Sequence, residues 1–312
     1  MSEQETRAIS AVGLNKGLQR RWRLGEKLIE SWIFLAGMLT IVVLLGIIAL
    51  LFKEGLPAFW YTPPWEFFFG TSWYPVSEPP TFGIMPFFVA TLWVTVVATA
   101  ISVPVGVACA AYLAEIAPVK VRETVKPIIE ILAGFPSIVM GFIGLILLSP
   151  LVQSALNLNT GLCGLSAGIM LSLMSLPIII SVSEDALRAV PDDFRHAAYA
   201  LGSTKWETIW HVSIPGALSG ITAAIMLGVG RAIGETMTVL MVAGGALAVP
   251  ISPTEPMMPM TAAIASGIGN AVRGGLQYQA LFAIGLILFV ITLAVNLIAD
   301  KVLERQKRKF AR

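Results

Sequence analysis

The sequence predicts an all-α membrane protein whose chain crosses the bilayer six times. Of its 312 residues, 56% are hydrophobic and only 13% are charged, whereas a soluble domain carries about a quarter charged residues. Six apolar runs approach or exceed the roughly 18 residues that a membrane-spanning helix needs. The basic residues are also distributed unevenly along the chain, which is typical of membrane proteins with several spans.

The N-terminal part of the chain is predicted to contain a basic segment and two spans. Residues 1–30 are polar and basic, and they form either an amphipathic helix along the membrane surface or a positively charged anchor for the first span. That span is predicted at 31–52. A segment rich in Trp, Tyr and Pro follows, and this composition is typical of an interfacial loop. The second span, predicted at 84–113, is longer than one bilayer crossing, so we expect it to tilt or to protrude.

The third span, predicted at 127–151, contains Pro136 and two nearby glycines, so we expect a weakened or kinked helix. A polar segment at 183–216 interrupts the later apolar runs, and a Pro- and Met-rich loop precedes the last one. The remaining spans are predicted at 162–182, 217–248 and 278–299. The domain organisation is therefore a basic segment 1–30, a six-span domain 31–300 that includes the polar segment 183–216, and a basic tail 301–312.

The basic residues predict the orientation of these spans. With six spans, both termini and both even-numbered loops lie on one side of the membrane. All but three of the 21 Lys and Arg residues lie on that side, and the exceptions are Lys53, Arg273 and Arg231. Because cytoplasmic loops carry an excess of positive charge, we expect a multi-pass protein of the plasma (inner) membrane with both termini in the cytoplasm.

Several chemistries find no support in the sequence. The cysteines, Cys109 and Cys163, lie in apolar surroundings, and with only two histidines they do not form a metal-ligand pattern. The chain contains no Gly-Lys dipeptide, so it lacks the loop that binds ATP phosphates in many ATPases. No catalytic motif and no nucleic-acid-binding pattern stands out. We therefore expect a protein that is not an enzyme, without a metal or another cofactor.

The polar segment 183–216 has a pattern of two short helices. Helices are predicted around 191–201 and 204–212, with a break at Gly202 and an end before Pro215. Ala197, Ala198 and Trp206 belong to a predicted apolar face that also includes Leu201, Ile209 and Trp210. A linker between spans seldom needs such a face, which favours a docking element. The pattern alone is also compatible with an ordinary linker.

The same segment resembles a signature of ABC-type import permeases. In that family, Glu-Ala-Ala is followed after three residues by Gly and after nine more by Ile-x-Leu-Pro. This sequence carries His196-Ala197-Ala198, then Gly202, then Val212-Ser213-Ile214-Pro215, so that His196 replaces the usual Glu. The resemblance implies a MetI-like importer fold in which coupling helices, including Trp206, dock on a separate ATPase subunit.

A second motif narrows the resemblance to phosphate-specific transporters. Residues 227–237 read Leu-Gly-Val-Gly-Arg-Ala-Ile-Gly-Glu-Thr-Met and are similar to the corresponding stretch of PstC-type permeases, as is Phe135–Gly141. The resemblance covers residues 83–299. It implies a phosphate importer made of this permease, a second PstA-like permease, two PstB-like ATPase subunits and an extracytoplasmic PstS-like phosphate-binding protein. The PstA type itself is the close alternative for this chain.

Arg231 and Glu235 are charged residues inside the fifth predicted span. A charge near the bilayer centre costs about 2.5–3.5 kcal/mol on insertion scales. At positions i and i+4 the two residues are expected to share a helix face, where they could form an ion pair with a structural role. The reading that the resemblance favours is a substrate pathway, in which the guanidinium of Arg231 offers planar donors to phosphate oxygens. In that pathway Glu235 keeps the anion from binding too tightly or receives its proton, and Thr236 and Thr238 add hydroxyl donors. Gly230 and Gly234 have the spacing of glycines that pack against another helix.

Two other functions remain open at this point. A permease of the same architecture could import another oxyanion, such as sulfate or molybdate. An ion-coupled secondary transporter would need a site for its coupling ion, yet only Arg231 and Glu235 are available as charges inside the membrane, and no inverted repeat is evident.

Overall fold

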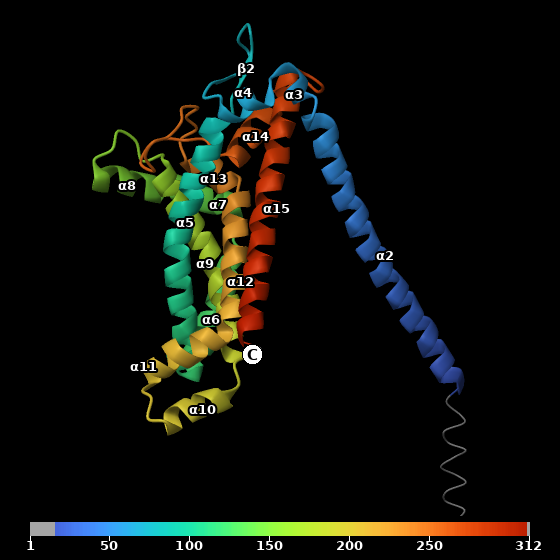
Figure 1. Cartoon of the computed structure of the whole chain (residues 1–312), viewed down its shortest axis with the longest axis vertical. Coiled ribbons are helices and arrows are strands. Elements are labelled where there is room, and N and C mark those ends of the chain that lie inside the picture. Colours follow the sequence, from blue (N-terminus) through green and yellow to red (C-terminus); the bar gives the residue numbers. More distant parts are fainter. Residues whose placement is uncertain (1–15, 311–312) are drawn as a thin grey trace, which may run out of the picture. The chain divides into compact units, whose positions relative to one another are not determined.

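The computed structural model describes residues 16–310 of the chain, and the side chains chiefly of residues 29–299 (Figure 1). The basic residues expected at 1–15 and at 311–312 lie outside the described residues. The chain divides into two units, residues 1–53 and 54–312. The first unit contains most of one long helix, α2 (Lys16–Gly55). The first span and the basic residues from Lys16 onward therefore share one helix, rather than being separated by a distinct surface helix.

The second unit is built around four long helices that run side by side (Figure 1). Together with α2 and the helix Ser137–Leu156, they make six helices long and apolar enough to cross a membrane within the described residues, which confirms the predicted number of spans. The helix α5 continues into a π-helical end, η1. The four helices are α5 (Met85–Ala111) with η1 (Tyr112–Ile116), α9 (Gly164–Arg188), α12 (Ile214–Gly234) and α15 (Leu276–Phe310).

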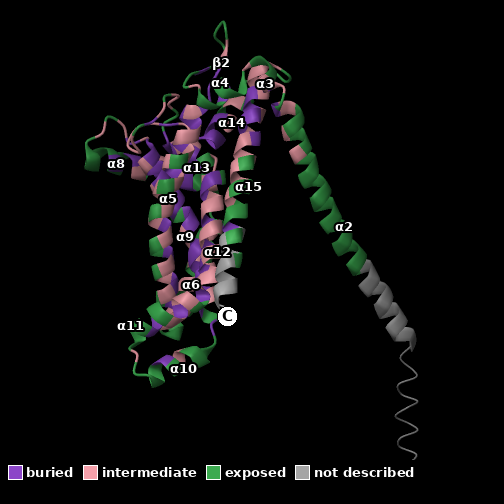
Figure 2. Cartoon of the chain, viewed as in Figure 1, coloured by how far each residue is buried: buried purple, intermediate pink, exposed green. Residues whose placement is uncertain are grey.

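The helix α9 forms the centre of this unit, and its side chains are more buried than those of its neighbours (Figure 2). Small residues let α5 approach it closely. A Cβ atom built on Gly106 would lie 2.6 Å from Cγ2 of Ile179, and one built on Gly168 would lie 2.5 Å from Cγ1 of Val97. Because contacts between helices in a membrane depend on close packing rather than on the hydrophobic effect, these glycines set the distance between the two helices.

The third span is broken rather than merely kinked. Its first part is α6 (Val119–Ala133), and Gly134, Phe135 and Pro136 interrupt the helix. The helix then resumes at Ser137 and continues to Leu156. Proline has no backbone N–H and restricts the residue before it, so a helix readily ends at this point. The second part consists of α7 (Ser137–Ile143), η2 (Gly144–Leu148) and α8 (Ser149–Leu156).

One end of the second unit is covered by the aromatic segment that precedes α5 and by α14 (Met260–Ile268). A short hairpin pairs Trp73 with Phe82, and the ring of Trp73 lies edge-on to Phe82 and Phe87, 5.4 and 5.2 Å away. The expected interfacial loop thus has a buried aromatic anchor. Its elements are α3 (Ala58–Tyr61), α4 (Pro64–Phe69), β1 (Trp73–Tyr74) and β2 (Thr81–Phe82).

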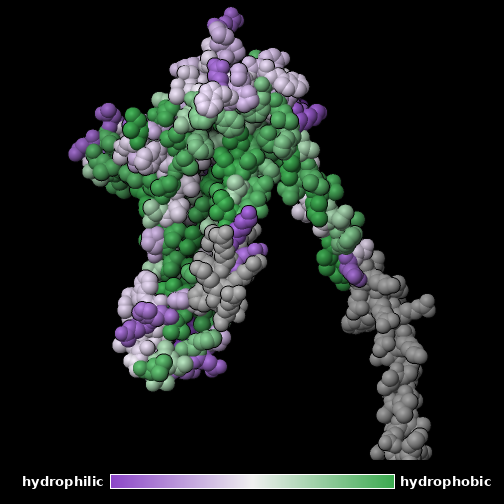
Figure 3. Space-filling view, viewed as in Figure 1, coloured by the Kyte–Doolittle hydropathy of each residue, from purple (hydrophilic) through white to green (hydrophobic). Residues whose placement is uncertain are grey.

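The opposite end of the second unit carries the polar segment. It contains α10 (Asp192–Ala200), α11 (Lys205–Thr208) and the π-helical η3 (Ile209–Ser213). In Figure 3 hydrophilic residues gather at this end, whereas the long helices between the two ends expose a hydrophobic surface. This distribution fits a bundle that crosses a bilayer, with α10 and α11 outside the hydrocarbon.

We predict that Gly168→Ala destabilises the bundle by about 1–3 kcal/mol, because the added methyl group overpacks the contact with Val97. The measurement is thermal unfolding of the purified protein in detergent. Gly269→Ala is the matched control, because a Cβ atom there meets no other atom within 4 Å. Equal midpoints for the two variants would show that α5 and α9 do not depend on this close approach.

Candidate functional site

The fifth span ends at a break that contains two of the predicted site residues. The helix α12 ends at Gly234, and the chain resumes helical structure in α13 (Met237–Val242). Between them, Glu235 has extended backbone angles, φ −70° and ψ 131°. The backbone carbonyl of Glu235 accepts a hydrogen bond of 2.8 Å from Oγ1 of Thr261 in α14. A group that the break leaves without a helical partner is thus satisfied by a side chain, as hydrocarbon requires.

The breaks in the third and fifth spans lie against each other. Oγ1 of Thr238, in α13, donates a hydrogen bond of 2.9 Å to the carbonyl of Ser137, at the start of α7. The side chain of Thr238 is fully buried, and Oγ1 also lies 3.2 Å from Sδ of Met174. A Cβ atom on Gly141 would come within 3.1 Å of Cα of Thr238. In this conformation Thr238 therefore joins two helices rather than presenting a free hydroxyl group.

Arg231 lies one turn before the break, and its guanidinium group is unpaired. Within the part of the chain that the structure describes, it makes no ion pair and no hydrogen bond, and its Nε atom is buried without a partner. The expected pairing with Glu235 on one helix face is wrong, because α12 ends at Gly234 and Glu235 leaves the helical path. Glu235 Oε1 instead accepts a bond of 3.3 Å from the backbone N–H of Thr236.

The helix positions of Gly230 and Gly234, on either side of Arg231 in the sequence, face no other part of the described chain. Cβ atoms built on Gly230 and Gly234 would meet no other atom of the described chain within 4 Å. No helix of the described chain packs against these glycines, so the expected packing against another helix stays a prediction for a helix of another subunit. The glycine that does so is Gly228, whose Cβ atom would lie 2.7 Å from Ile179. The hydroxyl of Thr236, a half-buried residue, donates a bond of 3.3 Å to the carbonyl of Gly234.

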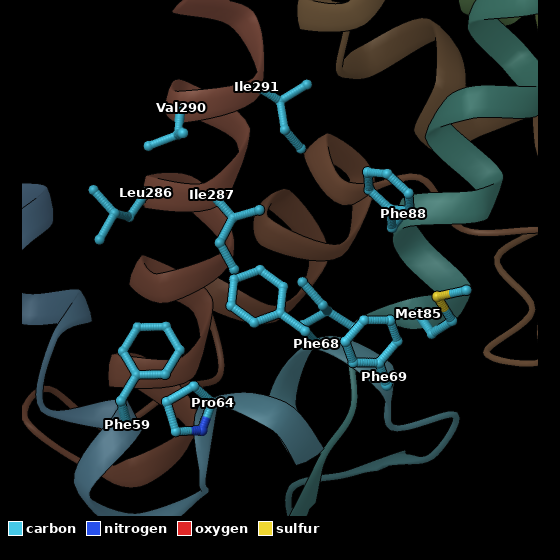
Figure 4. A pocket seen from close by; sticks show the side chains of 11 residues that line it. Phe59, Pro64, Phe68, Phe69, Met85, Phe88, Leu286, Ile287, Val290 and Ile291 are labelled. Carbon is cyan, nitrogen blue, oxygen red and sulfur yellow. The ribbon is translucent and has the colours of Figure 1, made fainter. Parts of the chain in front are cut away.

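An apolar pocket elsewhere in the second unit offers nothing to an anion. It has a volume of about 630 Å³ and lies between α4, α5 and α15 (Figure 4). Its lining side chains are hydrocarbon apart from one methionine sulfur. The pocket therefore lacks the hydrogen-bond donors that an oxyanion needs, and it is separate from Arg231. The lining includes Phe59, Phe68, Phe69, Met85, Phe88 and Ile287.

The polar segment forms two helices around Gly202, as predicted. Gly202 has φ +87°, in the region that favours glycine, and the chain reverses there between α10 and α11. The next helix starts with a capping box: the backbone N–H of Thr204 donates to Oε2 of Glu207 at 2.8 Å, and the backbone N–H of Glu207 donates to Oγ1 of Thr204 at 3.3 Å.

The second helix does not end before Pro215. The elements α11, η3 and α12 follow one another without a loop as 30 helical residues from Lys205 to Gly234, and α11 lies at an angle to α12 (Figure 1). The predicted end is wrong because Pro215, near the start of α12, follows five residues of wider π-helix. That widening relieves the requirement for a proline N–H and the clash with the preceding turn. The polar segment is thus joined to Arg231 without an intervening loop.

The predicted docking residues are mostly exposed. His196, Ala197, Gly202 and Trp206 are exposed, Pro215 is half-buried, and Ala198 is buried. The expected apolar face is only partly buried within the chain, because Leu201 is 89% exposed and Trp206 is 62% exposed. The rings of Trp206 and Trp210 lie edge-on, 5.9 Å apart. An exposed aromatic surface at a polar end is typical of a protein-binding site. We call Phe194, Tyr199, Leu201, Trp206 and Trp210 the aromatic surface.

Sequence reasoning missed two groups of ion pairs near the same end. In the first, Nζ of Lys126 in α6 donates to Oε2 of Glu184 at 2.5 Å and to Oδ1 of Asp185 at 2.6 Å. Glu184 is almost completely buried in α9. In the second, Arg195 of α10 pairs with Glu115 of η1 at 2.8 Å. The positions of these charges at neighbouring ends of predicted spans were the signal that could have indicated the pairs.

Comparison with known proteins agrees with this architecture. Residues 102–309 match the family described as "Binding-protein-dependent transport system inner membrane component". The chain is 35% identical over 277 residues to the probable ABC transporter permease protein YqgH of Bacillus subtilis (strain 168), covering 88% of each chain. It is 35% identical over 305 residues to the phosphate transport system permease protein PstC of Mesorhizobium japonicum, covering 92% of each.

Solved structures show a related fold. A chain of the MetNI methionine ABC transporter, in an inward-facing conformation, superposes with a TM-score of 0.54 at 20% identity, covering 70% of this chain and 93% of that chain. The fold is therefore that of MetI-type importer permeases, as the resemblance predicted. Because the sequence identity is only 20%, the superposition is evidence for the fold and not for the function.

We predict that Thr204→Ala weakens the start of the helix Lys205–Gly234 by about 1 kcal/mol, because it removes the capping box. Hydrogen exchange of the backbone amides of residues 205–208, measured by mass spectrometry on the purified protein, should become about fivefold faster. Ser203→Ala, one residue outside the box, is the control. Exchange that is equally fast in both variants would contradict the role of the box.

Proposed function

The chain belongs to the family of binding-protein-dependent transport system inner membrane components, and from this premise we propose that it imports phosphate as a permease subunit of an ATP-driven transporter. It is a multi-pass membrane protein and a transport component rather than an enzyme. Transporters of this family work with an ATPase and a substrate-binding protein. We propose phosphate as the substrate because PstC-type permeases from several bacteria are about 35% identical to this chain over most of its length.

The unpaired guanidinium of Arg231 is the observation that carries this proposal. A charged side chain inside a membrane normally faces the interior of a bundle or a cavity and has a partner. Arg231 has no partner among the described residues, and the neighbouring Gly230 and Gly234 face no other part of the described chain. A guanidinium offers five N–H donors in a plane that suits the oxygens of phosphate. The proposed passage therefore runs past Arg231, with Glu235 and Thr236 at its side.

Glu235 complements Arg231 in this proposal. The two side chains are not paired with each other, so the carboxylate does not occupy the donors that the anion needs. Its negative charge near the passage keeps an anion from binding too tightly, because like charges repel. Thr238 contributes indirectly, since its hydrogen bond to Ser137 holds the breaks in the third and fifth spans together.

The proposed orientation places α10 and the aromatic surface in the cytoplasm, together with both termini. It is supported by the basic residues, of which all but Lys53, Arg231 and Arg273 then lie on the cytoplasmic side. An ATPase subunit that binds the aromatic surface would move the helix Lys205–Gly234 at its cytoplasmic end. Because this helix is continuous, the movement reaches Arg231 and switches the passage between outward and inward access.

The proposed partners follow from this arrangement. They are a second, PstA-like permease, two PstB-like ATPase subunits on the cytoplasmic side, and a PstS-like phosphate-binding protein on the other side. The second permease would close the passage on the side where Gly230 and Gly234 leave open space. Membrane lipid would surround the remaining apolar surface (Figure 3).

We predict that Arg231→Lys lowers phosphate uptake about tenfold or more, because a lysine keeps the charge but loses the planar set of donors. Glu235→Gln should change the uptake rate as well, since it removes the negative charge next to the anion. The measurement is uptake of labelled phosphate into proteoliposomes that contain the complete transporter, with ATP and the binding protein. Sulfate and molybdate are tested in the same assay.

The control for these variants is Gly269→Ala, which adds a methyl group in open space away from Arg231. Unimpaired uptake by both charge variants would contradict a passage beside Arg231. Uptake that needs no ATP would indicate an ion-coupled carrier instead. Transport of sulfate or molybdate in place of phosphate would indicate another oxyanion.

We also predict that Trp206→Ala and Leu201→Ala weaken binding of the ATPase subunit, because each removes an exposed apolar side chain of the aromatic surface. The loss for the tryptophan is expected to exceed about 1 kcal/mol, as is usual where a buried aromatic residue anchors an interface. Co-purification of the ATPase in increasing salt measures it. Trp60→Ala, at the opposite end and 84% exposed, is the control and should leave binding unchanged.

A further inference from the structure

The helix α10 is attached to the rest of the bundle mainly by one side chain. Of its nine residues from Asp192 to Ala200, only Ala198 is buried. Arg195 is the residue that reaches into the bundle, and there it meets two other elements. One is η1, the π-helical end of the span Met85–Ile116, which carries Glu115. The other is the end of α9 and the turn after it, at residues 187–190.

All five N–H groups of the Arg195 guanidinium have acceptors. The Nε–H points to both carboxylate oxygens of Glu115, at 3.1 and 3.2 Å. Nη2 donates to Glu115 Oε1 and to the carbonyl of Leu187, both at 2.8 Å. Nη1 donates to the carbonyl of Val190 at 2.7 Å and to Asp192 Oδ1 at 2.8 Å. A guanidinium has five N–H donors in a fixed plane, so no other side chain can make this set of bonds.

The acceptors lie on parts of the chain that are distant in sequence. Glu115 precedes Arg195 by 80 residues. The carbonyl of Leu187 belongs to the last turn of α9 and that of Val190 to the turn that follows, so the positive charge of Arg195 also caps the negative end of that helix. One side chain thus connects α10 with two helices, α5 through η1 and α9 directly.

The pair of Arg195 and Glu115 is buried, which makes it sensitive to the loss of either partner. The side chains are 12% and 6% exposed, whereas Asp192 is 81% exposed. Burial alone would lower the pKa of Arg195, but the hydrogen bonds and charges of Glu115 and Asp192 raise the pKa above its usual value. A buried ion left without its partner is strongly unfavourable. The bond to Asp192, by contrast, lies at the surface and contributes little.

The local backbone also presents Glu115 to α10. The last five residues of the span Met85–Ile116 are π-helical. A π-helical turn changes the direction in which the following side chains point, and such turns are frequent at functional sites. The same span packs along α9 for most of its length, through Gly106 and Gly168. A displacement of η1 therefore acts on the tightly packed centre of the bundle.

We infer that Arg195 is a positioning residue that links the docking segment to the span Met85–Ile116 and to α9. The inference rests on the proposed function, in which an ATPase subunit moves α10. Under it, the movement reaches the bundle by two routes. One is the continuous helix Lys205–Gly234, and the other is the ion pair between Arg195 and Glu115. The second route moves α5 and α9 together with the fifth span.

The test uses the complete transporter reconstituted in proteoliposomes, with three variants: Arg195→Lys, Glu115→Gln and the double variant Arg195→Lys/Glu115→Gln. Uptake of labelled phosphate and hydrolysis of ATP are measured on the same vesicles. We expect assembled transporters that still hydrolyse ATP, while phosphate transported per ATP falls about tenfold in each single variant. The double variant should transport at least as much phosphate per ATP as the more impaired single variant, because all three variants break the same ion pair between Arg195 and Glu115.

Two control variants accompany these. Asp192→Asn removes the exposed partner of the same arginine and should keep the wild-type ratio of transport to hydrolysis. Lys126→Gln breaks the other ion-paired group, which joins α6 to α9 without touching α10. It should lower the amount of folded protein without lowering the ratio of transport to hydrolysis.

Other outcomes would overturn the inference. An unchanged ratio in assembled Arg195→Lys and Glu115→Gln transporters would show that α5 needs no link to α10. Loss of ATPase binding, measured by co-purification, would show that Arg195 only shapes the docking surface. Failure of all three variants to assemble would assign Arg195 a structural role alone. The proposed function fails separately, when the wild-type transporter takes up no phosphate or does so without ATP.

Discussion

Hydrocarbon imposes one constraint on which the structure depends: each backbone N–H and C=O group inside the bilayer needs a partner within the protein. Two spans of this chain break, and a break frees backbone groups. In the fifth span the carbonyl that the break frees, that of Glu235, accepts a hydrogen bond from the side chain of Thr261, and Thr238 joins this region to the start of α7 through the carbonyl of Ser137. Irregular backbone is tolerated at this depth only where protein or a water-filled cavity surrounds it. The paired breaks therefore mark the part of the bundle where polar chemistry can occur.

The same constraint explains how the polar segment is joined to that region. A helix satisfies its own backbone, so the chain can run without interruption from Lys205 to Gly234. Pro215 would disturb such a helix, but the π-helical residues before it accommodate the missing N–H. The helix stops just after Arg231. A helical connection without a loop thus leads from the aromatic surface to the arginine, and the chain changes direction at Gly202 and at Glu235.

The sequence predicted the features that depend on local composition. The six spans follow from the length of the apolar runs, and the turn at Gly202 follows from a position that needs a positive φ. The parts that depend on distant contacts were not predictable. An ion pair between Arg231 and Glu235 requires a helix that continues through both residues. The helix instead ends between them, and the hydrogen bond that stabilises this break comes from Thr261, 26 residues further along the chain. The sequence marks Arg195 only as one of many basic residues that set the orientation, because its partner Glu115 is 80 residues away, at the end of the span Met85–Ile116.

The two arginines of this region show how differently one side chain can be used. Arg195 has an acceptor for each of its five N–H groups, and each acceptor belongs to the protein. Arg231 has no acceptor among the described residues, although its Nε atom is buried. An unsatisfied guanidinium in hydrocarbon is too unfavourable to persist without a partner. Its donors must therefore be satisfied from outside the described chain, by water, by a second subunit or by the transported anion. Under the proposed function, the transported anion is the partner of these donors, and the second permease covers the helix face at Gly230 and Gly234.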